Sequence, residues 1–334
     1  MRDHRAKALF CVGRRWMALT LGLLVLLGFQ DWARAQDYPT HAVRIIVPFP
    51  AGGTADAVPR IVADWLSHKW GQPVVIENPT GAAGSIGAEL VYRAAADGYT
   101  LLAAPPPPLV INQNLYPDLA YDPGKFEPVI VMARVPNGLF VNPDKVRASN
   151  VPQLIEDLRR NPGEVTCATQ GYGTTSHLTS ELFQLMAKAP LRQIPYRGSA
   201  PALQGLVAGD VDVMFDNLGV SLPLVESGKL RLLAVASPGR LASLPNVPAI
   251  AEYLTGFEAV AWYGIVAPPH TPANIVEKVN ADVNEALRDP QVQNRLKKLS
   301  AEVVGGSVER TANYLREETE RWGSVIKAAN IRMQ

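Results

Sequence analysis

Residues 43–70 read VRIIVPFPAGGTADAVPRIVADWLSHKW, and this stretch decides the fold. The residues at 43–49 are mostly β-branched or apolar, which predicts a buried strand. From 56 to 70 apolar side chains recur with helical spacing, which predicts a helix with one buried face. The loop between them carries Gly52 and Gly53. A strand, a glycine loop and a helix in this order are typical of an α/β fold.

The same alternation of strand and helix patterns continues along the chain, which favours largely parallel strands. It is interrupted after residue 129, where two short extended runs flank Pro136-Asn137-Gly138 with no helix between them. We expect further helices at 85–96, 152–160, 175–188, 200–208, 272–288, 291–299 and 307–329, and further strands at 74–77, 99–104, 129–133, 139–142, 164–169, 192–196, 211–215, 230–236 and 257–267.

The chain has 334 residues, more than one compact core usually holds, so two domains are expected. The pattern predicts two lobes with Rossmann-like sheets, joined by a two-strand hinge near 130–142 and 255–266. Lobe 1 would comprise residues 36–137 and 260–334, and lobe 2 residues 138–259. Ligands of such sheets bind beyond the carboxyl ends of strands, where helices begin.

The first 35 residues have the pattern of a signal peptide. Residues 1–15 are basic, an apolar run covers 16–29, and Ala33-Arg34-Ala35 gives the small-x-small cleavage pattern. The apolar run is shorter than the roughly 20 residues that a membrane anchor needs. We therefore expect cleavage after Ala35 and export to a bacterial periplasm. The exported chain would keep Cys167 alone, with no internal disulfide, as a buried strand residue.

Charge and motifs exclude several classes of function. The chain carries 32 basic and 31 acidic side chains, and beyond residue 35 the balance is slightly acidic. Nucleic-acid binding is therefore not expected. The sequence has no HExxH, CxxC or GxxxxGK[ST] motif, and its histidines lack metal-ligand spacing. We predict no metal and no cofactor.

Two glycine-containing loops at expected helix starts suit a small anion. In the loop 48–56, Gly52 and Gly53 allow close approach of the backbone, and Phe49 offers a stacking surface. In the loop 169–177, the three hydroxyls of residues 174–176 crowd the helix start. Free N–H groups and the positive end of the helix dipole attract anions at such places. The alternative is that both are ordinary capped turns.

A third loop gives a competing hypothesis. Ala83-Gly-Ser-Ile-Gly87 resembles the nucleophile elbow of hydrolases, with Ser85 as nucleophile and Asp216 and His270 following in the expected order. The alternative is a serine that begins a helix. In the stretch 195–202, Arg197 would pair with a carboxylate or remain a solvated surface residue.

Several motifs in sequence order resemble the Bug-type solute-binding proteins of tripartite tricarboxylate transporters. They are Pro48 to Asp56 with Arg60, Asn78 to Gly87, Asp97 to Leu102, Asn114 to Pro123, Gly171 to Leu178, Pro195 to Gly198, Asp212 to Asp216 and Leu244 to Pro248. Two positions depart from the family pattern. Pro59 stands where the family usually has alanine, and Pro105 to Pro108 forms a stiff wall.

The resemblance implies a type II periplasmic-binding-protein fold and a binding protein, not an enzyme. Such a protein closes on a small organic carboxylate and delivers it to membrane permease subunits. Ligand presentation to a membrane sensor and a secreted hydrolase using Ser85 remain the alternatives. The acid is left open between a di- or tricarboxylate and an aromatic acid. The expected ligand-binding residues are Phe49, Gly52, Gly53, Thr54, Asp56, Ser85, Ala104, Gln170, Gly173, Thr174, Thr175, Ser176, Tyr196 and Asp216.

Overall fold

The computed structural model describes residues 38–328 and residue 331, and a compact unit begins at His41. The expected signal peptide lies outside the described residues. No helix of the described part of the chain is long and apolar enough to cross a membrane. The strands are β1 (Val43–Ile46), β2 (Val74–Glu77), β3 (Thr100–Ala104), β4 (Glu127–Val141), β5 (Thr166–Thr169), β6 (Arg192–Pro195), β7 (Val213–Asn217), β8 (Arg231–Val235), β9 (Val260–Ala267) and β10 (Glu302–Val303).

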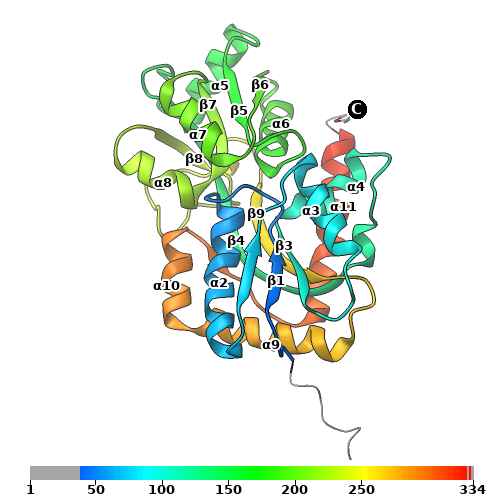
Figure 1. Cartoon of the computed structure of the whole chain (residues 1–334). Coiled ribbons are helices and arrows are strands. Elements are labelled where there is room, and N and C mark those ends of the chain that lie inside the picture. The colour runs from blue at the N-terminus through cyan, green and yellow to red at the C-terminus, as the bar shows by residue number, and fades with distance from the viewer. Residues whose placement is uncertain (1–37, 329–330, 332–334) are drawn as a thin grey trace, which may run out of the picture. The chain divides into compact units, whose positions relative to one another are not determined.

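These strands form one mixed sheet in the order β2-β1-β3-β9-β4-β7-β5-β6, and β8 and β10 also pair with β4. Helices surround its two halves, which gives the two-lobed α/β fold expected from the sequence (Figure 1). The helices of eight or more residues are α2 (Thr54–Trp70), α3 (Ser85–Tyr92), α5 (Val151–Arg160), α6 (Thr175–Ala187), α7 (Ser199–Ala208), α8 (Leu218–Glu226), α9 (Ala273–Arg288), α10 (Pro290–Lys298) and α11 (Val308–Ala328).

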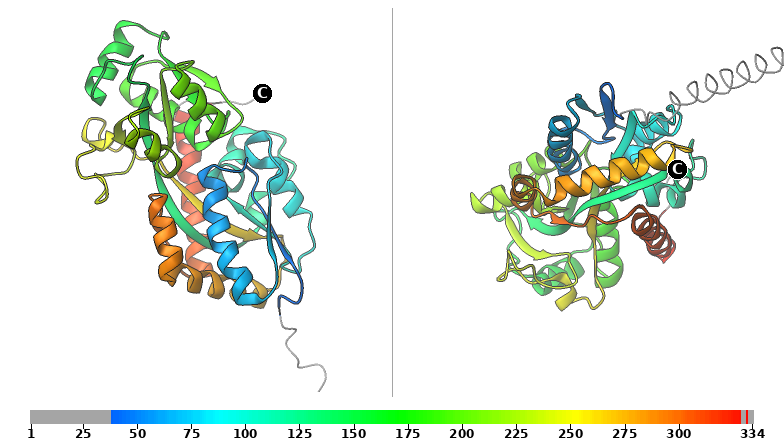
Figure 2. Two further views of the ribbon diagram at one scale, coloured as in Figure 1. Left: turned by 60° about the vertical axis from the view of Figure 1, so that its left-hand side comes forward. Right: turned by 90° about the horizontal axis from the view of Figure 1, so that it is seen from below.

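Lobe 1 is the half built on β1, β2, β3 and β9. Strand β1 pairs in parallel with β2 and β3, and β3 pairs antiparallel with β9. Helix α2 buries its apolar stripe and packs against α9 and α10 (Figure 2). Residues from both ends of the chain share this core, including Ile46, Leu102, Trp262 and Trp322. The last helices of the chain therefore complete the lobe that the first strands begin.

Lobe 2 is the half built on β5, β6, β7 and β8. Strand β5 pairs in parallel with β6 and β7. Its core contains Phe183, Phe215 and Phe257, and the first two rings lie 5.4 Å apart. Cys167 is a free, fully buried thiol on β5, as expected for a structural cysteine. Burial raises its pKa to about 12, so it is a poor nucleophile.

Strand β4 joins the two lobes. Its residues Glu127–Pro136 pair antiparallel with β9, and its residues Asn137–Val141 pair antiparallel with β7. The chain crosses a second time beside it, where the Asn137 N–H donates to the Ala259 carbonyl at 3.3 Å. These are the two crossing segments expected near 130–142 and 255–266. The crossings are antiparallel, whereas the sequence pattern favoured largely parallel strands.

Two expectations along the chain are wrong. The two short strands around Pro136 are one continuous strand of 15 residues. Proline lacks an N–H group, but Pro136 stands where β4 exchanges β9 for β7, so its missing donor interrupts neither ladder. Helix α8 was not expected between β7 and β8, because Pro223 lies inside it and masks its helical pattern.

The proline run after β3 is also more regular than a rigid connector. Pro107–Ile111 forms a single π-helical turn, and Asn112–Leu115 continues it as the short helix α4. Proline is tolerated in a first helical turn, because the N–H groups there have no partner within the helix. The prolines at 105–108 are all buried. The segment thus forms a wall of lobe 1.

Candidate functional site

Four helices begin around one small cavity between the lobes. Lobe 1 contributes the start of α2, and lobe 2 contributes the starts of α6, α7 and α8. The free volume is about 20 Å³, enough for about one water molecule. The cavity is lined by Phe49, Pro50, Gly53, Thr54, Ala55, Pro105, Pro107, Gln170, Thr174, Thr175, Gly198, Ser199, Asn217 and Tyr263.

The helix starts direct backbone N–H groups toward this cavity, and no cation lines it among the described residues. Gly53, Gly198 and Asn217, the residues before α2, α7 and α8, make no side-chain capping bond in the described chain. Thr174 does cap α6, because its hydroxyl accepts the His177 N–H. Among the described residues that line the cavity, none is Lys, Arg or His. Backbone N–H groups and helix dipoles are therefore its means of attracting an anion.

The loop before α2 is held by a network around Asp56. This carboxylate is 3% exposed and accepts hydrogen bonds from the Gly52 N–H (3.1 Å), Arg60 Nε (2.8 Å) and Asn78 Nδ2 (3.0 Å). Asn78 also donates to the Phe49 carbonyl at 2.9 Å. Burial raises the pKa of Asp56, but these donors outweigh it and leave the pKa lowered. Asp56 thus braces the loop that presents Gly53 and Thr54.

The loop before α6 divides into lining residues and supporting residues. Gln170, Thr174 and Thr175 line the cavity. Ser176 is buried, and its hydroxyl donates to the Phe215 carbonyl of β7. The Gly173 N–H donates to His177 Nδ1 at 3.3 Å.

His177 is therefore a satisfied helix residue. Its side chain is buried, and its Nε2 lies 3.7 Å from Glu181 Oε1. Burial lowers the pKa of its imidazole to about 4.

Asp216 lies behind the cavity at the end of β7 and is fully buried. Its carboxylate accepts hydrogen bonds from Gln170 Nε2, from Ser199 Oγ at 2.6 Å and from Ser221 Oγ at 3.0 Å. Burial raises the pKa of this carboxyl, and the donors around it act in the opposite direction. Two of its three side-chain partners, Gln170 and Ser199, line the cavity. Asp216 therefore holds two lining side chains in place, although it does not itself line the cavity.

The predicted catalytic triad is not assembled. Ser85 begins α3, and its hydroxyl accepts from Asn112 Nδ2 at 2.8 Å. The side-chain partners of Asp216 are Gln170, Ser199 and Ser221. The backbone N–H of His270 donates to Glu127 Oε1 at 3.1 Å, beside another surface cavity. Each member of the proposed triad thus has a different set of neighbours, so the hydrolase hypothesis is wrong in its geometry.

Of the residues expected to bind ligand, the structure brings six together at the cavity: Phe49, Gly53, Thr54, Gln170, Thr174 and Thr175. Tyr196 instead packs against Gly205 of α7, and Ala104 is buried at the end of β3. The remaining six expected residues do not line the cavity and lie in supporting positions: Gly52, Asp56, Ser85, Gly173, Ser176 and Asp216.

Sequence reasoning missed several lining residues. Gly198 and Ser199 stand in the stretch 195–202, which was singled out for Arg197, and Asn217 directly follows Asp216. Tyr263 lies within an apolar run on β9, so no local signal marks it.

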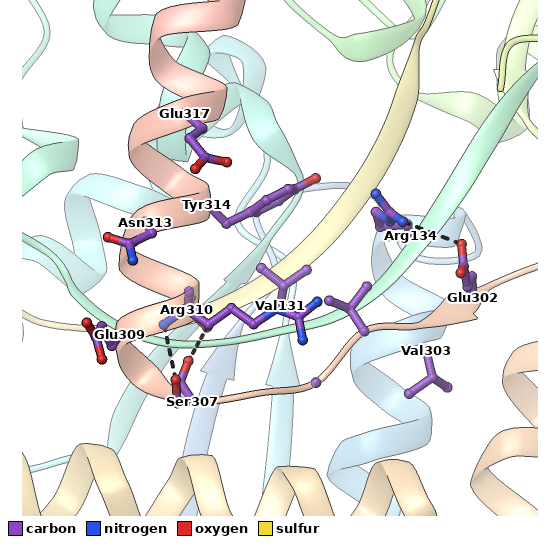
Figure 3. Close-up of a pocket in the computed structure, with 13 residues that line it drawn as sticks. Val131, Arg134, Glu302, Val303, Ser307, Glu309, Arg310, Asn313, Tyr314 and Glu317 are labelled. Carbon is purple, nitrogen blue, oxygen red and sulfur yellow. Dashed lines mark hydrogen bonds and ion pairs between the residues drawn. The ribbon is translucent and has the colours of Figure 1, made fainter. Parts of the chain in front are cut away.

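A larger cavity of about 640 Å³ lies on lobe 1, between β4, β10 and α11 (Figure 3). Arg134 and Arg310 line it together with Glu302, Glu309 and Glu317. Arg134 and Glu302 approach to 3.7 Å. Because the three carboxylates of this cavity outnumber its two guanidinium groups, its charge does not favour the binding of an anion. We therefore place the candidate site at the smaller cavity, although its volume is far lower.

The two-lobed fold and an interlobe cavity lined by helix starts define the class of periplasmic solute-binding proteins. The sequence matches the family model described as tripartite tricarboxylate transporter family receptor over residues 58–331. It is 35% identical to the protein BugT of Bordetella pertussis over 303 residues, which cover 90% of this chain and 93% of BugT. The chain belongs to this receptor family, with Bug-type relatives.

Two solved structures that contain a carboxylic acid show the same fold. R. palustris Rpa4515 with adipate is 38% identical with a TM-score of 0.85, covering 89% of this chain and 100% of that chain. MatC (Rpa3494) from Rhodopseudomonas palustris with bound malate is 33% identical with a TM-score of 0.81, covering 86% and 100%.

Proposed function

We propose that this protein captures a small organic carboxylate in the interlobe cavity and delivers it to membrane permease subunits of a tripartite tricarboxylate-type transporter. The observation that carries the proposal is the convergence of the starts of α2, α6, α7 and α8 on one cavity. The relatives solved with adipate and malate bind acids of this kind. The binding residues would be those that line the cavity, led by Gly53, Thr54, Thr174 and Thr175.

Neutral donors suit a receptor that must release its ligand. A hydrogen bond to a charged group contributes roughly 1.5–3 kcal/mol. Three or four of them, after the cost of association, support a micromolar complex of about −8 kcal/mol. A buried Arg partner would bind the carboxylate more tightly and bidentately. Among the described residues that line the cavity, none is an arginine, which favours ready release of the ligand.

Binding would require the lobes to move. A dicarboxylate needs more than about 20 Å³ of free volume, so the lobes would open to admit it and close again around it with small shifts of the lining side chains. In the present arrangement the lobes touch at the mouth, where a Cβ on Gly198 would lie 3.0 Å from Pro50 Cγ. We propose that the crossing segments in β4 and at Ala259 are the hinge. We keep the lobe boundaries at 137/138 and 259/260, because β4 exchanges its sheet partner at Pro136 and Asn137.

The place of action follows from the N-terminal pattern. We propose that the chain is cleaved after Ala35 and acts in the periplasm, consistent with the periplasmic origin named for a BugD structure that is 33% identical with a TM-score of 0.84. Mass spectrometry of the protein from a periplasmic extract tests this. We expect a chain that begins at Gln36. A chain that retains residues 1–35 would contradict the proposal.

A thermal-unfolding screen tests the binding function. The protein from a periplasmic extract is unfolded and refolded, so that no copurified acid remains, and is then mixed with mono-, di- and tricarboxylates. The control for each acid is its uncharged amide. At 100 times Kd, a true ligand stabilises the folded state by about 2.7 kcal/mol. A shift for the acid but not for its amide is expected. No shift with any acid would refute carboxylate capture.

A further inference from the structure

Two chains of hydrogen bonds reach the cavity, and both have a fixed direction. The first begins at the Tyr263 hydroxyl, which donates a hydrogen bond to Asn217 Oδ1 at 2.7 Å. Asn217 Nδ2 donates to Asn137 Oδ1 at 2.7 Å, and Asn137 Nδ2 donates to Thr179 Oγ1 at 2.7 Å. The Thr179 hydroxyl donates to the Thr175 carbonyl at 2.6 Å. A carbonyl can only accept, so every proton in the chain is donated in the direction from Tyr263 to Thr175, and the Tyr263 hydroxyl has no proton left for a ligand.

The second chain ends on Asp216. Ser199 Oγ, Gln170 Nε2 and Ser221 Oγ all contact its two carboxylate oxygens. Burial raises the pKa of this carboxyl, but Gln170 Nε2 and the Asn217 N–H can only donate to it, and we take it as ionised. An ionised carboxylate accepts and cannot donate, so each partner must supply the proton. Ser199 and Gln170 line the cavity. Because the Ser199 hydroxyl donates its proton to Asp216, it has no proton left to donate to a ligand.

The cavity is therefore lined by two unlike kinds of polar group. The helix starts supply N–H donors, whereas the Ser199 and Tyr263 hydroxyls supply lone pairs only. The Thr54 hydroxyl is 2% exposed and has no hydrogen-bond partner among the described residues. The Tyr263 hydroxyl lies near it, but not in hydrogen-bonding geometry. Thr54 is free to donate or to accept.

A carboxylate oxygen placed against the Ser199 and Tyr263 oxygens would meet only other acceptors, which is unfavourable. We infer that the ligand carries a hydrogen-bond donor, a hydroxyl or an ammonium group, close to a carboxylate, because both kinds of lining group face one small cavity. The carboxylate lies at the helix starts, and the donor faces Ser199 and Tyr263. Asp216 is the positioning residue that makes Ser199 an acceptor. This inference rests on the proposed function and names its ligand class.

The matched acids malate, aspartate and succinate test the inference by calorimetry on the refolded full-length exported protein. They share two carboxylates and differ by a hydroxyl, an ammonium group or neither. One lost hydrogen bond with an unpaired buried acceptor predicts that succinate binds at least about tenfold more weakly than the better of the other two. The better of malate and aspartate identifies the donor. Equal binding of all three overturns the inference but not the proposed function.

If no acid in the wider carboxylate screen binds, both the inference and the proposed function fail. If other acids bind, the same comparison is made between each acid that binds and its 2-hydroxy or 2-amino analogue. Preference for the unsubstituted acid overturns the inference alone.

Variants separate the positioning role from a structural one. In Asp216→Asn the new amide can donate to Ser199, which frees the serine proton for the ligand. The preference over succinate should then fall to about threefold or less. Asp212→Asn is the matched control, because Asp212 accepts from the Thr166 N–H (2.7 Å) and hydroxyl (2.6 Å) in the same lobe and does not line the cavity. It should keep the wild-type preference.

If Asp216→Asn fails to fold, Tyr263→Phe replaces it as the test. This variant removes the other acceptor and leaves Asp216 intact. It should weaken malate or aspartate binding and leave succinate binding within about twofold. An unchanged preference in whichever of Asp216→Asn and Tyr263→Phe folds, or an equal loss in the Asp212→Asn control, overturns the inference.

Discussion

Gly173 is the residue where closure of the lobes can be perturbed most cleanly. It has a φ of +77°, which side chains with a Cβ rarely adopt. A Cβ there would lie 3.2 Å from Leu115 Cδ1 and 3.3 Å from Ala83 Cβ, both on lobe 1. Gly163 has the same φ of +77° with nothing within 4 Å of its Cβ position. Alanine at the two positions therefore shares the backbone cost and differs in the contact between lobes.

The expected changes in stability and affinity follow from the backbone cost and from the contact between lobes. A left-handed backbone costs a residue with a Cβ about 1–2 kcal/mol, so both Gly173→Ala and Gly163→Ala should lower the free energy of unfolding by that amount. Crowding in a packed contact costs about 1–3 kcal/mol more, and in Gly173→Ala it applies to the closed arrangement alone. Affinity for the tightest acid of the screen should fall roughly 5- to 150-fold in Gly173→Ala and stay unchanged in Gly163→Ala.

Denaturant unfolding and calorimetry measure the two quantities on the same preparations. Equal affinities in Gly173→Ala and Gly163→Ala would refute the reasoning, because the contact between Gly173 and Leu115 would then not belong to the liganded state. An equal loss of affinity in both variants would also refute it, since the backbone cost alone would explain the effect.

Three further predictions concern the lobes. Because burial lowers the pKa of His177 to about 4, the unfolded chain binds a proton first, so stability should fall by about 3 kcal/mol as pH drops from 6.5 toward 4. His177→Asn should flatten this slope in denaturant unfolding, and an unchanged slope would contradict the assignment. Cys167 should react with a disulfide reagent only as the chain unfolds, and rapid labelling of the native protein would be inconsistent with its burial. Asp56→Asn should lower the free energy of unfolding at pH 7 by about 1–3 kcal/mol, because three donors lose a charged acceptor, and a value equal to wild type would argue against the brace.

The sequence predicted the parts of this fold that depend on local periodicity. The strand, loop and helix of residues 43–70 are present as β1 and α2, and the crossing segments lie where the pattern lost its helices. The sequence-based predictions of secondary structure were wrong at two prolines. Proline usually marks the end of an element in a sequence, but Pro136 lies inside β4, where the strand changes its sheet partner, and Pro223 lies inside α8, where one i to i−4 hydrogen bond is left unmade.

The candidate site divides in the same way. Residues at helix starts, such as Thr54 and Thr174, are marked by glycines and hydroxyls in the sequence. Tyr263 is not marked, since its place at the cavity follows from the long-range pairing of β9 with β4. The acceptor character of Ser199 depends on Asp216, 17 residues further along the chain. A single sequence does not display such pairings.

The central claim is that a carboxylate binds between the lobes at the start of α2, and calorimetry on variants of Gly53 tests it most directly. Gly53 has ordinary backbone angles, with φ of −87°, and its Cβ position lies 3.8 Å from Ser199 Cβ. Gly53→Ala should therefore fold and bind, whereas Gly53→Phe should fold but fill the cavity. We predict one acid per chain for wild type and Gly53→Ala, and no detectable binding for Gly53→Phe. Wild-type affinity in a folded Gly53→Phe variant would contradict the account.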